Sequence, residues 1–111
     1  MSKFVRIGDC QIDTIAGLIK GWPCYGRVGN WVLSAPADCF GKPMDPVLYL
    51  VITHEPTGMR FGYAPSDLRK AVASLQRYHQ LFGESSTARG VMQKWKKLPP
   101  KDKAWISGTR K

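Results

Sequence analysis

The fold is decided by the stretch VLYLVITHEPTGMRFGY, residues 47–63. Its first part, Val47–Ile52, is the most apolar run of the chain and is rich in β-branched and aromatic residues, which predicts a central strand buried on both faces. In Glu55–Gly58, proline occupies the second position and glycine the fourth, as in a type I turn. The stretch therefore predicts an antiparallel hairpin.

The strand after this turn is expected to alternate, with Arg60 on one face and, on the other, Met59, Phe61 and Tyr63. A second hairpin is predicted earlier in the chain, where Cys24–Val28 and Trp31–Ala35 flank Gly29-Asn30. A two-residue connection of this kind supplies the positive φ that tight hairpin turns need. Between the hairpins, Pro36–Pro46 holds three prolines and a glycine, which predicts a long loop.

The N-terminal part is less regular. Lys3–Ile7 predicts a short opening strand. From Cys10 to Lys20, apolar residues recur at helical spacing, namely Ile12, Ile15, Ala16 and Ile19. Gly21 and Pro23 follow as stop signals, so a helix is expected over this segment, although isoleucines this frequent also fit a strand.

Two further helices are predicted in the C-terminal half. In the first, Ser66–Phe82, capped by Ser66 or Asp67 and stopped by Gly83, one apolar sector holds Leu68, Ala71, Val72, Leu75, Tyr78, His79 and Phe82. His79 is therefore expected to be a hydrogen-bonded core histidine. The second helix follows Thr87, buries Trp95 on its apolar face and ends at Pro99-Pro100.

These elements predict one α+β domain, because 111 residues have the length of a single core. We expect an antiparallel sheet of about four to five strands, packed by the amphipathic helix, within residues 1–83. Residues 84–111 are expected to form a basic helical C-terminal extension that either packs on the core or projects from it, because Lys101–Lys111 has too little apolar content for a core of its own.

The order of strands 24–64 and the following helix resembles the small sheet-plus-helix DNA-binding domains of plant ethylene-response factors and integrase arms. That resemblance implies a sheet that enters the major groove, braced by the helix. The predicted strands, however, carry only Arg27 and Arg60 as obvious base-reading residues, and most of the positive charge follows the strands.

The charge is segregated along the chain. Residues 1–67 carry six basic and six acidic groups, whereas residues 68–111 carry eleven basic groups and only Glu84 and Asp102. The C-terminal part thus holds the whole net charge of +9. Clustered like charges raise the local concentration of a polyanion, which points to nucleic acid as the partner.

The strongest candidate site is the cluster of lysines and tryptophans in the C-terminal part, where lysines neutralise phosphates and an exposed indole stacks on an unpaired base. We expect Trp105 to stack. The expected phosphate contacts are Arg89, Lys94, Lys96, Lys97, Lys101 and Lys103, extended along the first helix by Arg69, Lys70 and Arg77.

Other chemistry has little support in the sequence. Cys10, Cys24, Cys39 and His54 lie 14 to 15 residues apart, whereas structural zinc sites bring ligands in close pairs, so no metal site is expected. His54 and Glu55 are adjacent on a strand and point to opposite faces, which disfavours an acid–base pair. No phosphate-binding or hydrolase motif occurs, and neither catalytic residues nor a cofactor are predicted.

The sequence therefore predicts a non-enzymatic DNA- or RNA-binding protein of weak sequence specificity. We expect it in the cytoplasm, because the N-terminus lacks a signal-peptide pattern and no run is long enough to span a membrane. The alternative is a small phage or mobile-element inhibitor or adaptor, of the anti-CRISPR type, that binds an acidic or nucleic-acid-binding protein. Its contact surface would be the Pro36–Pro46 loop, with Phe40 and Met44 as anchors.

Overall fold

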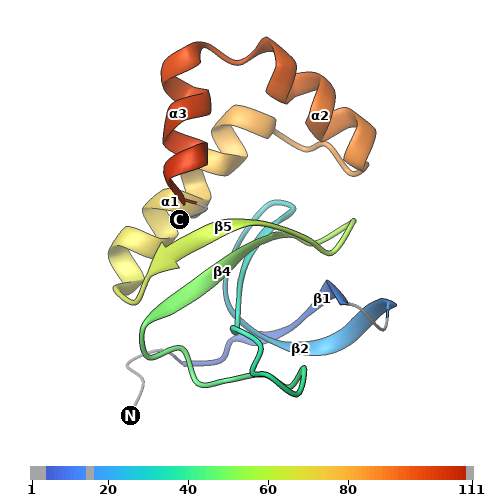
Figure 1. Ribbon diagram of the computed structural model, residues 1–111, viewed down its shortest axis with the longest axis vertical. Coiled ribbons are helices and arrows are strands. Elements are labelled where there is room, and N and C mark those ends of the chain that lie inside the picture. Colours follow the sequence, from blue (N-terminus) through green and yellow to red (C-terminus); the bar gives the residue numbers. More distant parts are fainter. Residues whose placement is uncertain (1–4, 15–16, 110–111) are drawn as a thin grey trace.

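Five antiparallel strands follow one another in sequential order in a single sheet, and three helices cover one of its faces (Figure 1). The computed structural model describes residues 5–14 and 17–109. The elements are β1 (Gly8–Thr14), β2 (Gly17–Val28), β3 (Trp31–Ser34), β4 (Tyr49–His54), β5 (Met59–Pro65), α1 (Leu68–Phe82), α2 (Ala88–Lys97) and α3 (Pro100–Thr109). The expected α+β domain with an antiparallel sheet is confirmed.

The predicted helix over Cys10–Lys20 is wrong, because this segment belongs to β1 and β2. Cys10 and Ile12 are buried while Asp13 is exposed, so the described part of β1 follows the alternation of a strand. Gly17 and Gly21 in β2 have φ of 100° and 79°, which a helix does not contain. Ile15 and Ala16, which supported the helical spacing, lie outside the described residues.

The predicted opening strand is also wrong in its described part, since residues 5–7 have no regular structure and β1 begins only at Gly8. Lys3 and Phe4 lie outside the described residues. Backbone pairing nevertheless starts close by, because the Ile7 amide donates to the Cys24 carbonyl at 2.8 Å.

Both predicted hairpins are confirmed. Gly29 has φ of 58° in the tight turn between β2 and β3, and the Gly58 amide donates to the Glu55 carbonyl at 3.1 Å to close the turn before β5. The central strand begins two residues later than predicted and extends to His54. Val47 and Leu48 are exposed and continue the long loop that begins at Pro36.

The expected alternation of β5 fails at a β-bulge. Ile52 pairs with Gly62 and Thr53 with Arg60, so Phe61 has no residue opposite it. Phe61 packs in the main core, with its ring 5.1 Å from that of Trp31. The bulge therefore places Arg60 and Tyr63 on the same face of the sheet, the face opposite to the helices.

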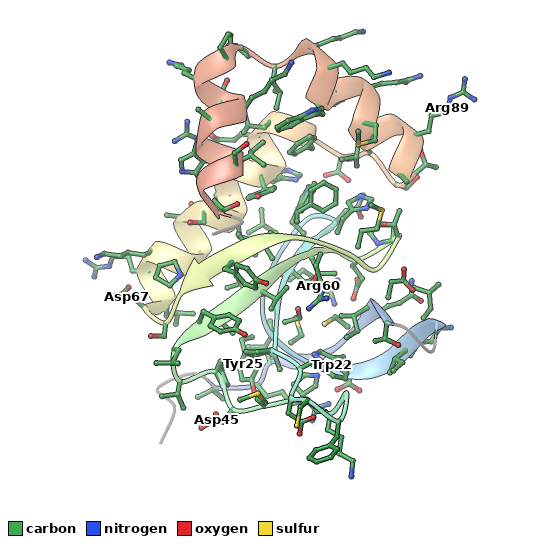
Figure 2. All side chains as sticks on the ribbon, viewed as in Figure 1. Trp22, Tyr25, Asp45, Arg60, Asp67 and Arg89 are labelled. Carbon is green, nitrogen blue, oxygen red and sulfur yellow. The ribbon has the colours of Figure 1, made fainter. Side chains whose placement is uncertain are left out.

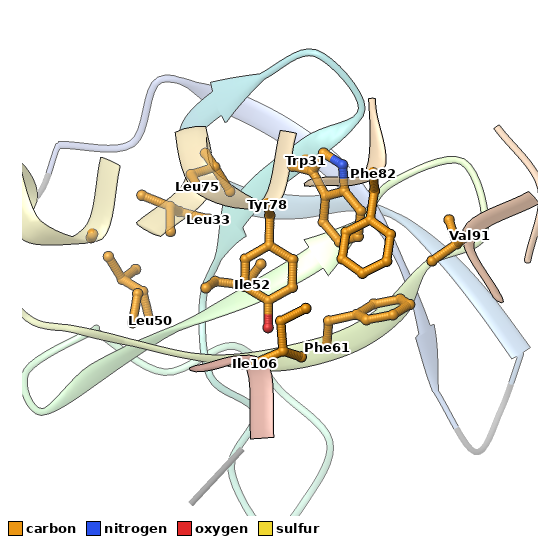
Figure 3. Packing of buried hydrophobic residues seen from close by; sticks show 12 residues of the cluster. Trp31, Leu33, Leu50, Ile52, Phe61, Leu75, Tyr78, Phe82, Val91 and Ile106 are labelled. Atoms are coloured by element: carbon orange, nitrogen blue, oxygen red, sulfur yellow. The ribbon is translucent and has the colours of Figure 1, made fainter. Parts of the chain in front are cut away.

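The main core lies between the sheet and the helices (Figure 3). Trp31 is fully buried at its centre, with ring centroids 5.0 Å from Tyr78 and 5.3 Å from Phe82 of α1. Asp67 caps α1 by accepting a hydrogen bond from the Lys70 amide at 3.1 Å. Helix α1 then ends at Gly83, whose φ is 63°.

Helices α2 and α3 complete this same core. Thr87 caps α2, as predicted, and Val91 of α2 is buried in the main cluster. Ile106 of α3 is 0% exposed there, although Lys101–Lys111 has too little apolar content for a core of its own. Gly62 lets α3 approach β5, because a Cβ atom at Gly62 would overlap the Thr109 hydroxyl. The described part of residues 84–111 is thus packed on the sheet and α1.

The sheet curls so that β1 reaches the turn between β4 and β5 (Figure 1). The Asp13 amide donates to the Gly58 carbonyl at 2.7 Å, and the Gln11 amide donates to the Glu55 carboxylate at 3.3 Å. Glu55 also accepts two hydrogen bonds from the Arg27 guanidinium, which holds the pKa of the Glu55 carboxyl below its ordinary value. The concave face of this curled sheet holds a second apolar cluster, made of Cys10, Ile12, Trp22, Cys24, Val32 and Ala35.

Candidate functional site

The three helices and their connections, residues 68–109, form a layer on one face of the sheet, which we call the helical layer. The positive charge that the sequence places in its C-terminal part therefore lies on one side of the folded protein. Residues 68–109 contain nine basic residues and only two acidic ones, Glu84 and Asp102. The rest of the described chain contains five basic and six acidic residues. The helices lie on one side of the sheet, so that side of the molecule is strongly basic (Figure 1).

Arg77 and Trp105 are engaged within the protein. The Arg77 guanidinium lies 3.3 Å from the Asp102 carboxylate and 4.4 Å from the centre of the Trp105 ring. The same indole packs against Tyr78, with the ring centroids 5.3 Å apart. A base that stacked on Trp105 would therefore compete with Arg77, so this indole is a weaker stacking candidate than its sequence context suggests.

Of two further predicted lysines, Lys103 makes contacts that join two helices, whereas Lys94 is exposed and lies near the end of a helix. The Lys103 ammonium donates to the Lys96 carbonyl at 3.3 Å and lies 5.8 Å from the Trp95 ring, which joins α3 to α2. Lys94 reaches back to the end of α1, where a Cβ atom on Gly83 would lie 3.2 Å from its ammonium. A cation there is favourable, because the C-terminus of a helix carries partial negative charge.

The other six predicted cations point to solvent. Within the described residues, no ion pair involves any of them: Arg69, Lys70, Arg89, Lys96, Lys97 and Lys101. Lys96 and Lys97 end α2, and Lys101 lies in the first turn of α3, so these three surround the corner between the two helices. We call Lys96, Lys97 and Lys101 the corner cations.

The remaining three exposed cations occupy positions that helix stability disfavours. Arg69 and Lys70 lie in the first turn of α1, and Arg89 lies in the first turn of α2, while neither turn holds an acidic residue. A cation near a helix N-terminus costs about 0.3–1 kcal/mol, because that end carries partial positive charge. Figure 2 shows Asp67, which precedes Arg69 and Lys70 in the chain, on the opposite side of the helical layer from Arg89. The exposed cations are therefore spread around this layer.

The concave face of the sheet holds a pocket that the sequence did not indicate. Its volume is about 650 Å³, and every strand contributes to its lining. The apolar part comes from Ile12, Ile19, Trp22, Ala35 and Val51, and the Phe40 loop forms one side. Arg60 lines the pocket as well, because it points away from its neighbour Phe61, which packs in the main core on the other face. The one sequence signal was an arginine within an otherwise apolar strand.

The residues considered for metal binding or catalysis do not form a site. His54 is fully buried, with Nδ1 2.9 Å from the Thr57 hydroxyl and Nε2 2.5 Å from the Ser85 carbonyl, so it joins the sheet to the loop after α1. Glu55 is bound to Arg27 instead. Among the described residues, no three potential metal ligands come together.

His79 differs from the expected core histidine. Its side chain is half-buried, its Nδ1 has no hydrogen-bond partner within the described residues, and its Nε2 lies 3.7 Å from the Glu84 carboxylate. The role expected for Cys10 and Cys24, small buried side chains, agrees with their burial. Each thiol donates to a backbone carbonyl, Cys10 to that of Pro23 and Cys24 to that of Gly26, and the interaction between the two neighbouring sulfur groups lowers the pKa of Cys24 to about 7 and raises that of Cys10.

The resemblance to sheet-plus-helix DNA-binding domains left two arginines as base-reading residues, and in the structure both make other interactions or line another site. Arg27 is paired with Glu55, and Arg60 lines the concave pocket. Comparisons with protein-family models, with curated proteins and with solved structures found no match. None of the helices in the described chain is long and apolar enough to cross a membrane.

Proposed function

We propose that the protein binds nucleic acid, without catalysis, through phosphate contacts from the exposed cations of its helical layer. The observation that carries the proposal is the set of seven exposed cations, the six above and Lys94, without ion-pair partners in the described residues, on the side of the molecule opposite to most of the acidic groups. Surface cations of this density attract a polyanion and release its counterions.

The corner cations are the proposed centre of the interface. Lys96, Lys97 and Lys101 lie close together in the chain and on two helices that the core holds in place through Val91 and Ile106. Contacts of this kind are made with the backbone, which gives affinity and register but little sequence information. Since Trp105 is occupied by Arg77, we place base stacking second to phosphate contacts. The unpaired cysteines fit a cytoplasmic location, where thiols stay reduced.

A pair of charge-matched variants tests the proposal. Lys96→Ala/Lys97→Ala and Lys20→Ala/Lys42→Ala each remove two exposed lysines, the first pair from the helical layer and the second from the sheet side. Fluorescence anisotropy of labelled single- and double-stranded oligonucleotides, titrated at several salt concentrations, gives the affinity and its salt dependence. The first variant should reduce the log–log salt slope by up to about 0.9 per lost phosphate contact, and the second should leave it unchanged. Equal effects would show that net charge alone matters.

A protein-binding role has a separate observation in its favour. The long loop exposes several large apolar side chains, with Phe40 83% and Leu48 80% accessible. Exposed aromatic and aliphatic residues in a loop are suitable anchors for a protein partner, as an inhibitor or adaptor would need.

Deletion of residues 99–111 does not separate the two functions, because it would remove Ile106 from the core. A double variant of the loop, Phe40→Ser/Leu48→Ser, separates them better. It should leave nucleic-acid affinity unchanged if the helical layer is the interface. Loss of a co-purified protein partner in this variant, with no nucleic-acid binding by the wild type, would favour the adaptor role.

A further inference from the structure

The pocket on the concave face lies on the opposite side of the sheet from the proposed nucleic-acid interface. Arg60 points from β5 into the space on the concave side of the curled sheet, and Trp22 of β2 lies on the other side of that space (Figure 2). The residues that separate the pocket from the helices are those of the sheet itself, so a ligand here would not touch the corner cations. A ligand of this pocket would therefore be a different molecule from the nucleic acid bound by the corner cations.

The size and the lining of the pocket suit the apolar part of a small molecule. A volume of about 650 Å³ lies within the range of small-molecule sites, roughly 300–1,000 Å³. Ile19 presents a half-buried aliphatic side chain, and the almost fully buried side chains of Ile12, Trp22 and Val51 form an apolar floor. Burial of an apolar group against such a lining is favourable because it removes apolar surface from water.

The polar groups at the base of the pocket already have partners. The Trp22 indole donates to the Ala35 carbonyl at 2.8 Å. The buried hydroxyls of Ser34 and Thr53 lie 3.0 Å apart, and the Ser34 hydroxyl also donates to the Val51 carbonyl at 3.2 Å. The base of the pocket therefore has little need of further hydrogen bonds, and a ligand would be oriented by the groups at its mouth.

Three charged residues line the mouth. Arg60 is exposed and makes no ion pair within the described residues. The Asp38 carboxylate is engaged within the loop, because its Oδ1 accepts hydrogen bonds from the amides of Phe40 and Lys42 at 2.8 and 2.9 Å. Asp13 is the third, and its carboxylate is exposed. Arg60 thus offers donors for one anionic group, while two nearby carboxylates disfavour a ligand of higher negative charge.

We propose that this pocket binds a small organic monoanion with an apolar body. The apolar body lies against Trp22, Ile19 and Val51, and the anionic group is bound by the Arg60 guanidinium. The site is independent of the nucleic-acid interface, because it lies on the other face of the sheet.

Two fluorescent probes test the charge requirement. Anilinonaphthalene sulfonate has an apolar body and one negative charge, and N-phenyl-1-naphthylamine has a similar body without the charge. The variants are Arg60→Met, which removes the cation at the mouth, and Lys20→Met, which removes an exposed cation of β2 that does not line the pocket. We expect Arg60→Met to weaken the sulfonate by about tenfold and the neutral probe by less than about twofold. Lys20→Met should change neither probe.

A third variant tests the location. Ala37 is exposed and lines the pocket, so Ala37→Leu should narrow it without disturbing the core. It should weaken both probes, with circular dichroism showing that each variant keeps the wild-type fold. The proposal is overturned if the wild type binds neither probe, if Ala37→Leu leaves both affinities unchanged, or if Arg60→Met and Lys20→Met weaken the sulfonate equally. A cationic probe that bound more tightly than the sulfonate would also overturn it.

Discussion

Replacement of Ile106 by alanine should strongly destabilise the protein. Ile106 is the residue through which α3 enters the main core, and none of its surface is exposed. The change removes three carbon atoms, which corresponds to about 2.4 kcal/mol at about 0.8 kcal/mol for each buried methylene group. A cavity between α3, β5 and α1 adds to this, so the expected loss is about 2.5–4 kcal/mol of unfolding free energy.

Urea unfolding followed by tryptophan fluorescence measures this loss, with Ser107→Ala as the matched control. Ser107 is the exposed neighbour of Ile106 on α3, so its replacement should change the unfolding free energy by less than about 0.5 kcal/mol. For a domain of this size, Ile106→Ala should also lower the melting temperature by roughly 10–16 °C, at about 4 °C for each kcal/mol. An effect as small as that of Ser107→Ala would refute the packing of α3 in the core and would favour the other alternative that the sequence left open, a projecting extension.

Two further predictions concern the closure of the curled sheet. Glu55→Gln should cost at most about 1 kcal/mol at neutral pH, because the pair with Arg27 is partly exposed. Since folding lowers the pKa of Glu55, the wild type should lose this contribution as the pH falls below the ordinary value near 4.5, whereas the variant should lack that part of the pH dependence in urea unfolding. Gly58→Ala should destabilise more than Gly41→Ala. Both glycines have positive φ, but only at Gly58 would a Cβ atom lie 2.5 Å from the Asp13 amide nitrogen, so equal losses of stability would argue against a tight contact there.

The elements that were predicted correctly are those set by local chemistry. The turns at Gly29 and Gly58, the cap at Asp67 and the stop at Gly83 each depend on one or two residues and their immediate neighbours. Turn and cap residues have strong conformational preferences of their own, so these features were readable from the sequence.

The elements that were missed depend on contacts between distant parts of the chain. The isoleucines of Cys10–Lys20 fit both a helix and a strand, and the pairing of β1 with β2 decides between them. The bulge at Phe61 cannot be seen in the sequence of β5 alone, because it is defined by the register with β4. Ile106 and its neighbour Trp105 are the only large apolar residues of α3, too few to predict a core position, and the burial of Ile106 depends on the close approach of α3 to β5 beside Gly62.

The same distinction holds for the candidate sites. The basic character of the helical layer follows from composition and was predictable, but the engagement of Arg77 with Asp102 and Trp105 joins two helices and was not. The concave pocket draws residues from all five strands, so no short motif could have revealed it.

The salt dependence of nucleic-acid binding by the wild-type protein tests the central claim most directly. Fluorescence anisotropy with labelled oligonucleotides would be recorded over a series of salt concentrations. With seven exposed cations without ion pairs in the described helical layer, of which about four to five would contact phosphates, we predict binding whose log–log salt slope has a magnitude of about 3 to 5, at about 0.9 for each phosphate contact. No binding even at low salt, or an affinity that does not change with salt, would contradict the account.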